Sequence, residues 1–272
     1  MIQGWIECCR ATVVPAPGHG GRVVHGFDPS LYDRSMTRQP NNALRLAATA
    51  IPLRETSEGL EVLMVKRNEE LTFGGMWTFP GGVLEPDDGP APDISDETTV
   101  AWGAPSTLMT AAMAAVRETV EETGIHANTA SLAWYSHWIP PESARSRFAT
   151  WFFLAPDIAG EVMVDLDENS EARWLRPTQA LAEHAENNFA IIAPTWCTLD
   201  DLSEASTIGE LIDRAITQGP RYYHTRLVPG AANPWLVWEG DGAYESGDLE
   251  FAGTRNRASI DKHFRVLDRQ KN

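Results

Sequence analysis

Two mainly apolar segments in the first quarter of the chain are typical of β-strands. These segments are residues 44–53 and 60–66, and Glu55–Gly59 between them has the composition of a turn. The pattern therefore predicts a β-hairpin. Residues 1–40 contain Gly, Pro and His without any period, so we expect a poorly ordered N-terminal arm there.

In the middle of the chain, apolar residues recur with the period of an α-helix. The apolar residues that recur on one side of this helix predict its core stripe: Met109, Met113, Val116 and Val120. Ala111 and Ala114 lie on the opposite side, where small side chains would let a backbone loop pack closely. Gly124 predicts the end of the helix.

The rest of the pattern predicts a domain followed by an extension. Strands are expected at 132–138, 148–155 and 172–175, and a helix at 177–185. Later segments predict a helix start at Thr207 and strands at 222–228 and 235–238. We expect three parts: the arm 1–40, a domain 41–186 with an inserted Pro- and Asp-rich loop at 86–106, and a C-terminal extension 187–272.

Three carboxylates gather on the polar side of the predicted helix. Glu118, Glu121 and Glu122 lie at about 0°, 300° and 40° around its axis. Like charges at these spacings repel, so the face is unfavourable unless a cation lies among them. Clustered hard oxygen atoms suit Mg²⁺ or Mn²⁺. Arg117, four residues before Glu121, is placed to form an ion pair with it. The alternative is a solvated acidic helix face.

Upstream lies a glycine loop, Trp77-Thr78-Phe79-Pro80-Gly81-Gly82. Loop and helix together resemble the Nudix hydrolase signature, G-x5-E-x7-R-E-U-x-E-E-x-G-U, in which U is a bulky aliphatic residue. The matching residues are Gly82, Arg117, Glu118, Glu121, Glu122, Gly124 and Ile125. Two positions depart from it. Thr119 replaces an aliphatic residue, and the first Glu is not found at its spacing, because Asp88 follows Gly82 by six residues and Met109 precedes Arg117 by eight.

The resemblance implies a fold and a set of site residues. The fold is an α/β Nudix α/β/α sandwich with a mixed sheet, followed here by a C-terminal α+β extension. Glu121, Glu122 and the backbone carbonyl of Gly81 are expected to hold Mg²⁺ or Mn²⁺, with Glu118 as a further ligand or as the base and Arg117 beside it. One more acid in a loop after the sheet is expected, either Glu168 or Glu171.

A second stretch suggests a branch of this family and a substrate. Trp138–Pro141 and Arg147–Ala155 are similar to the RP2-type, coenzyme A diphosphatase-like branch. This resemblance implies hydrolysis of a diphosphate bond in coenzyme A or acyl-CoA. Arg67 and Arg147 are candidate substrate contacts because an acidic chain needs local positive charge to attract a diphosphate, and Trp138 is a candidate to stack on an adenine ring. The alternatives are an ADP-ribose or nucleotide-sugar pyrophosphatase, and a Nudix-fold nucleotide sensor without activity. The intact Glu residues favour an enzyme, and the missing first Glu favours the sensor.

Composition limits the partners and the compartment. The net charge of the 272 residues is −16, which argues against a nucleic-acid polymer as partner, because phosphate backbones need a basic surface. No apolar run reaches the length of a membrane span, and the first thirty residues do not resemble a secretory signal. Three cysteines form neither a disulfide framework nor a zinc spacing. We therefore expect a cytoplasmic protein that acts on a small nucleotide diphosphate.

Overall fold

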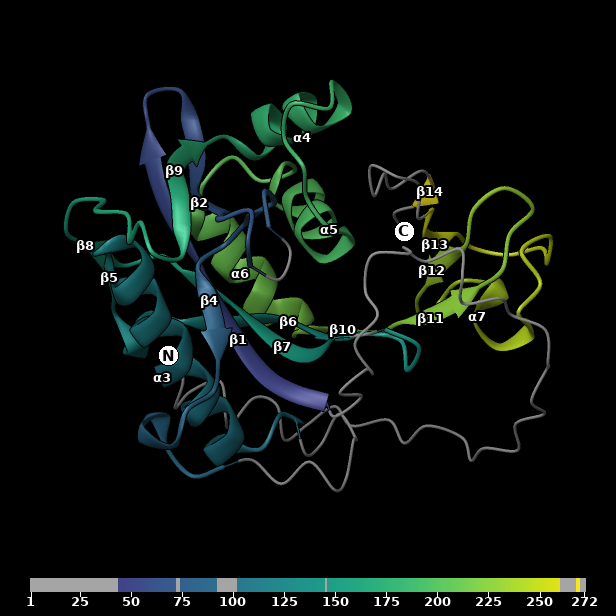
Figure 1. The fold of residues 1–272 in the computed structure, drawn as a ribbon, viewed down its shortest axis with the longest axis horizontal. Coiled ribbons are helices and arrows are strands. Elements are labelled where there is room, and N and C mark those ends of the chain that lie inside the picture. The colour runs from purple at the N-terminus through teal and green to yellow at the C-terminus, as the bar shows by residue number, and fades with distance from the viewer. Residues whose placement is uncertain (1–43, 72–73, 92–101, 145, 260–267, 270–272) are drawn as a thin grey trace.

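The computed structural model describes residues 44–71, 74–91, 102–144, 146–259 and 268–269 (Figure 1). The predicted arm 1–40 and residues 92–101 of the predicted inserted loop lie outside this part of the chain.

The central strand is β1 (Leu44–Thr56), which brings together three other strands. Along one edge it runs parallel to β7 (Arg147–Ala155) over nine residue pairs. Along its other edge it pairs first with β4 (Gly81–Val83) and then with β2 (Gly59–Arg67), both antiparallel. The glycine loop is therefore built into the sheet as a short strand, and β1 fixes its position.

The remaining strands extend this sheet on both sides, to eight strands in all. Beyond β7 come β6 (Ala133–Ile139), antiparallel to β7, and β10 (Arg221–His224), parallel to β6. On the other side, β3 (Trp77–Thr78) and β9 (Asn169–Leu175) are antiparallel to β2. Two parallel pairs among antiparallel ones make the sheet mixed, as predicted.

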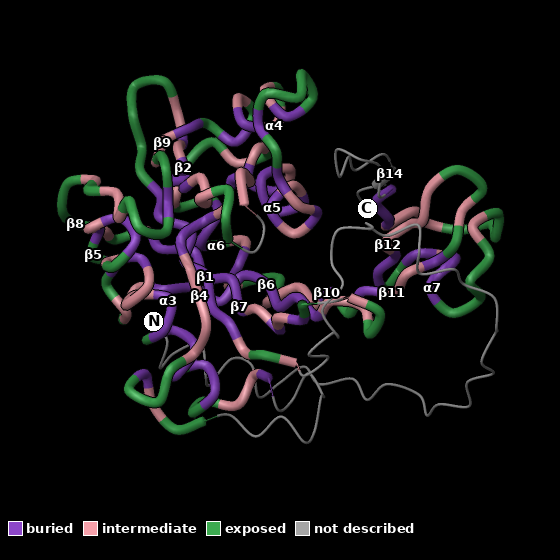
Figure 2. Tube along the Cα trace, viewed as in Figure 1, coloured by how far each residue is buried: buried purple, intermediate pink, exposed green. Residues whose placement is uncertain are grey.

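Helices cover both faces of the sheet, which gives the α/β/α layers (Figure 1). The helix α3 (Pro105–Thr123) packs on one face, and α4 (Pro177–Ala185), α5 (Ala193–Leu202) and α6 (Ile208–Gln218) pack on the other. Each face has its own cluster of buried apolar side chains. The buried segments in Figure 2 accordingly follow the central strands and the inner sides of the helices.

The buried side of α3 differs from the predicted core stripe. Met109 and Met113 are 44% and 41% exposed, and Val116 and Val120 are only half-buried. The fully buried side chains are instead the small ones, Ala111, Ala112, Ala114 and Ala115. The prediction is wrong because the acidic residues must face the glycine loop in the sheet. The acidic side is therefore the side that packs, and alanines allow the helix to approach β1 closely.

The helix ends as predicted. Gly124 adopts a left-handed conformation, with φ 69°, and its N–H donates to the carbonyl of Val120. The next strand, β5 (His126–Ala127), pairs with β8 (Ile158–Ala159) in a separate two-stranded ribbon. Two short 3₁₀ turns lie before and after α3 in the chain: η3 (Pro86–Asp88) and η4 (Thr129–Ser131).

The boundary expected at residue 187 does not coincide with a break in the structure. Residues of α5, α6 and β10 belong to the core and sheet of the main domain. The strand predicted at 222–228 is divided at Thr225, and its second half starts a smaller sheet. That sheet consists of β11 (Arg226–Val228), β12 (Trp235–Val237), β13 (Asn256–Ser259) and β14 (Asp268–Arg269), with α7 (Ala243–Ser246) beside it.

Across the described residues, no helix combines the length and the apolar character that crossing a bilayer requires.

The packing of α3 can be tested by comparing its two sides. We expect Ala115→Leu to lower the free energy of unfolding by about 1–3 kcal/mol, because the three added carbon atoms have no space against the sheet. We expect Met113→Gln to change it by less than about 0.5 kcal/mol, because this side chain faces outward. Urea titration of the two variants measures both. A larger loss for Met113→Gln than for Ala115→Leu would restore the predicted stripe.

Candidate active site

The guanidinium of Arg117 is the centre of a network that joins the loop, the sheet and the helix. Its Nε and Nη2 donate to the two carboxylate oxygens of Asp88, at 2.9 and 3.0 Å, and Nη2 also donates to the carbonyl of Val83 at 3.0 Å. Its Nη1 donates to Glu118 Oε1 at 2.9 Å and to Glu121 Oε2 at 2.8 Å. The predicted ion pair between Arg117 and Glu121 is therefore confirmed.

Asp88 provides a carboxylate at the position of the first Glu of the signature, which this chain lacks. It lies six residues after Gly82, the spacing of the first Glu in the signature. The turn η3 carries its shorter side chain to Arg117, and its Oδ2 also accepts from the N–H of Glu85 at 2.7 Å. Burial opposes ionisation, but the hydrogen bonds from Arg117 and Glu85 outweigh it and hold the pKa of Asp88 below its usual range.

The two glycines let the carboxylates approach the loop. The N–H of Gly81 donates to Glu122 Oε2 at 3.0 Å, and Glu122 is only 2% exposed. A Cβ atom on Gly82 would lie 2.3 Å from Glu118 Oε1, so the Glu118 carboxylate would have to move. A Cβ on Gly81 would lie 2.5 Å from the backbone carbonyl oxygen of Ala48 on β1. The missing side chains therefore let the loop lie against the sheet at Gly81 and close to Glu118 at Gly82.

Burial and neighbouring charges make the carboxylates reluctant to ionise. Burial raises the pKa of Glu122 to about 7, and the negative charge of Glu118 adds to the rise. The hydrogen bond from the N–H of Gly81 and the positive charge of Arg67 lower this pKa, but they do not cancel the rise. The amide of Asn169 faces Glu122 and favours its ionised form, although the two do not meet in ordinary hydrogen-bond geometry.

The pKa of Glu118 is also raised. Burial is the main cause and is only partly offset by Arg117, while the charges of Glu121 and Glu168 add to the rise. The carboxylates of the site therefore repel one another in the absence of a cation.

Of the two acids expected in the later loop, Glu168 lies at the site. Arg67 Nη2 is 3.9 Å from Glu168 Oε2, and Arg67 Nη1 is 3.5 Å from Glu122 Oε1. Glu171 instead pairs with Lys66 in the sheet, and its charge acts on Arg173. Arg67 therefore bridges the helix and the loop, and its Nη groups are positively charged donors beside the acidic cluster.

Two of the predicted substrate contacts are not at this site. Trp138 is buried, with its ring stacked on Tyr223 at 3.7 Å and edge-on to Trp238 at 5.5 Å, so it has no free face for a base. Arg147 is 9% exposed and pairs with Leu44 at the beginning of β1, whereas the glycine loop pairs around Thr49. Both predictions are wrong, because these residues belong to the packing of the sheet.

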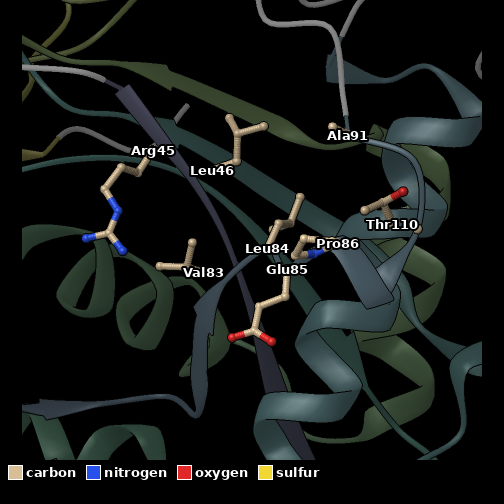
Figure 3. A pocket seen from close by; sticks show the side chains of 9 residues that line it. Arg45, Leu46, Val83, Leu84, Glu85, Pro86, Ala91 and Thr110 are labelled. Carbon is tan, nitrogen blue, oxygen red and sulfur yellow. The ribbon is translucent and has the colours of Figure 1, made fainter.

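A hollow of about 400 Å³ lies beside β4, between Arg45 of β1 and Thr110 of α3 (Figure 3). Its wall is mostly aliphatic and contains one other charged side chain, Glu85. None of the acidic residues of the helix lines it. We therefore assign the chemistry from the carboxylates themselves and not from this hollow.

The acidic cluster has suitable donors for a divalent cation. Among the described residues, no three His, Cys, Asp or Glu side chains converge in the arrangement of a metal site. The reason is visible in the network, since Arg117 draws Glu118 and Glu121 to one guanidinium and Arg67 approaches Glu122. The donors are nevertheless hard oxygen atoms that repel one another, and this chemistry fits Mg²⁺ or Mn²⁺.

Part of the chain matches a known protein family. The profile described as "NUDIX domain" matches residues 103–195, which include α3 and Glu168. Residues 103–195 are therefore similar to a Nudix domain. This match supports an enzyme of the Nudix hydrolase kind, as the signature predicts. No curated protein matches the chain.

The chain is also similar to solved structures of Nudix proteins. A Nudix hydrolase from Alicyclobacillus acidocaldarius is 21% identical with a TM-score of 0.50, over 64% of this chain and 96% of that one. A MutT Nudix hydrolase from Burkholderia pseudomallei is 19% identical with a TM-score of 0.35, over 50% and 86%. The Nudix domain of Shewanella oneidensis NrtR, solved with ADP ribose, is 17% identical with a TM-score of 0.38, over 60% and 89%. The first of these confirms the predicted fold class.

The Asp88–Arg117 pair gives a prediction for stability and its pH dependence. We expect Asp88→Asn to lower the free energy of unfolding at pH 7 by about 1–3 kcal/mol, because charge-assisted hydrogen bonds to a buried carboxylate are lost. The folded-state pKa of Asp88 is depressed, so its contribution is present above the unfolded pKa of about 3.9 and is lost as the pH falls through the folded value.

The difference between wild type and Asp88→Asn should therefore shrink when urea titrations are repeated from pH 5 down to pH 3. Asp87→Asn is the matched control, because Asp87 is exposed in the same turn. A difference that stays constant over this pH range would contradict the pairing.

Proposed function

We propose that the Nudix domain hydrolyses the diphosphate bond of a nucleoside diphosphate linked to another moiety. The observation that carries this proposal is the contact of Glu118 and Glu122 with the glycine loop, ordered by Arg117. Such a site places several carboxylates beside a close-packed backbone turn, and this arrangement suits a metal ion that binds phosphate oxygens.

The network around Asp88 favours an enzyme over a nucleotide sensor. The missing first Glu of the signature was the one feature that favoured the sensor. Asp88 takes that position and binds Arg117 with both carboxylate oxygens. The sensor alternative therefore loses its support, while Glu118, Glu121 and Glu122 remain in place for chemistry.

The residues have separate roles in this proposal. Glu118, Glu121 and Glu122, the carbonyl of Gly81 and Glu168 would hold Mg²⁺ or Mn²⁺. When bound, such a cation neutralises phosphate oxygens and lowers the pKa of a water molecule that attacks phosphorus.

The chain's own residues supply the remaining steps. Glu118, or another carboxylate of the cluster, takes the proton of the attacking water as the bond between phosphorus and the bridging oxygen breaks. Arg117 keeps Glu118 in one orientation, since Nη1 donates to it at 2.9 Å. Arg67, beside Glu122 and Glu168, is positioned to bind a phosphate oxygen of the substrate.

Coenzyme A or an acyl-CoA is the leading substrate in this proposal. Its support is the sequence similarity of Trp138–Pro141 and Arg147–Ala155 to the coenzyme A diphosphatase-like branch. ADP-ribose and nucleotide sugars are the second candidates, and one compared Nudix domain was solved with ADP ribose.

A substrate panel tests the function directly. The full chain is incubated with coenzyme A, acetyl-CoA, ADP-ribose, a nucleotide sugar and nucleoside triphosphates, with Mg²⁺ or Mn²⁺, and the products are identified by mass. We expect cleavage of coenzyme A into two phosphate-terminated products. Preferential cleavage of ADP-ribose would select the second candidate, and no cleavage of any compound would contradict the proposed function.

The acidic residues give the second test. We expect Glu122→Gln to lower turnover by at least about a hundredfold at saturating Mg²⁺, which corresponds to about 2.7 kcal/mol of transition-state stabilisation. We expect its stability to be unchanged or higher, because one buried like charge is removed. Glu161→Gln is the matched control on an exposed position of the neighbouring loop. Turnover near that of wild type in Glu122→Gln would contradict the proposed role of Glu122 in the reaction.

A further inference from the structure

Three successive backbone carbonyls of the loop before β9 converge on one residue, Asn68. The side-chain amide of Asn68 donates to the carbonyls of Leu166 and Asp167, at 2.9 and 3.0 Å. Its backbone N–H donates to the carbonyl of Glu168 at 2.9 Å. All three N–H donors of Asn68 are therefore used on the segment that carries Glu168.

The other end of this loop is tied to the catalytic helix. The N–H of Met163 donates to the carbonyl of Thr123 at 2.8 Å, and the N–H of Asp165 donates to that of Glu122 at 3.1 Å. These contacts anchor residues 163–165 to α3. The contacts with Asn68 anchor residues 166–168 to the end of β2. The loop therefore spans from one half of the site to the other.

An irregularity in the β2–β9 ladder sets the direction of Glu168. Lys66 pairs with Glu171, whereas Arg67 pairs with Asn169, so Ser170 is an extra residue on β9. As a result Asn169 is fully buried and faces Glu122, while Glu168 lies near Arg67. The backbone bonds of Asn68 follow directly after this irregularity and hold the chain in that register.

Glu168 itself has few constraints of its own. Its side chain is 51% exposed, and the charged group described beside it is Arg67, at 3.9 Å. A carboxylate on an exposed loop loses its position readily unless the backbone is fixed. Within the loop, the N–H groups of Asp167 and Asn169 donate to Asp165, each at 2.9 Å. The three hydrogen bonds from Asn68 tie this loop backbone to the end of β2.

We propose that Asn68 is a positioning residue, which holds Glu168 beside Arg67 and Glu118 in the geometry that the reaction uses. This inference rests on the proposed function, because it assigns Glu168 a part in hydrolysis. The residue type matters at this position, since only a side-chain amide offers two donors at this reach. An aspartate would place carboxylate oxygens, which only accept hydrogen bonds, against the carbonyl oxygens of Leu166 and Asp167. A serine would offer only one donor.

A double-mutant cycle tests the link between Asn68 and Glu168. We expect Asn68→Ala to lower kcat by about tenfold, as the loss of two hydrogen bonds predicts, with a smaller effect on KM. We expect Asn68→Ser to lie between wild type and Asn68→Ala. In the Glu168→Gln background, Asn68→Ala should cost less than about twofold, because the group that it positions is already disabled.

Asn256→Ala is the matched control. Its side-chain amide donates to the backbone carbonyl of Glu239 at 3.0 Å in the smaller sheet, remote from the acidic residues. It should leave kcat unchanged. Melting temperatures of all variants separate a loss of fold from a loss of position. Equal effects of Asn68→Ala in the wild-type and Glu168→Gln backgrounds would overturn the inference, and so would wild-type turnover in Asn68→Ala.

A binding measurement separates this inference from the proposed function. Free Mn²⁺ is followed by electron paramagnetic resonance during titration of each full-length variant. If wild type cleaves none of the panel, the proposed function fails and the cycle is read on Mn²⁺ affinity alone. An equal loss of Mn²⁺ affinity in Asn68→Ala and Glu168→Gln, with no further loss in the double variant, supports the positioning role. Additive losses of affinity, or unchanged affinity in both single variants, overturn it.

Discussion

The site depends on one guanidinium group that satisfies partners from three different segments. Arg117 binds Asp88 of the inserted loop, the carbonyl of Val83 at the end of β4, and two carboxylates of its own helix. Without it, Asp88 would be a buried, unpaired charge, and such a charge costs several kcal/mol. The loop, the sheet and the helix therefore share one electrostatic anchor, which adds to the apolar contacts between α3 and the sheet.

The alanines of α3 follow from the same requirement. The hydrogen bond from the N–H of Gly81 to Glu122 needs the helix backbone close to the sheet, and Ala111 and Ala115 are small enough to allow it. A wide apolar stripe of methionine and valine on that side would hold the helix too far away. The packing of this helix is therefore set by the distance that the site requires, and Met109 and Met113 lie on the outer side.

Much of the fold could be predicted from the sequence, because periodicity and turn residues are local signals. The strands around 44–66, the end of α3 at Gly124 and the helix 177–185 are where the patterns indicate. The orientation of α3 could not be predicted in this way. Its hydrophobic period favours burial of the methionines, and only the tertiary contact between the acidic side and the glycine loop reverses that choice.

The candidate site shows the same division between local and long-range signals. The spacing of Glu118, Glu121 and Glu122 is local and could be recognised directly. Asp88 was visible only as a count of six residues from Gly82, since its role depends on a contact with Arg117 across the insertion. Asn68 carried no signal at all, because its partners lie about a hundred residues away in sequence.

The balance of charges at the site points to the need for a cation. Asp88, Glu118, Glu121, Glu122 and Glu168 provide five carboxyl groups, whereas Arg117 and Arg67 provide two guanidinium groups. With all of them ionised the site has an excess of three negative charges. The raised pKa of Glu122, about 7, removes at most one of these near neutral pH.

A diphosphate that approaches this site would add further negative charge to an already negative surface, on a chain with a net charge of −16. Two arginines cannot offset both the carboxylates and the phosphates, because Arg117 is already bound on every side. Divalent cations add two positive charges each and replace the missing donors of the phosphate oxygens. The same carboxylate excess that destabilises the folded chain alone is therefore what would make it attract metal and, through metal, its substrate.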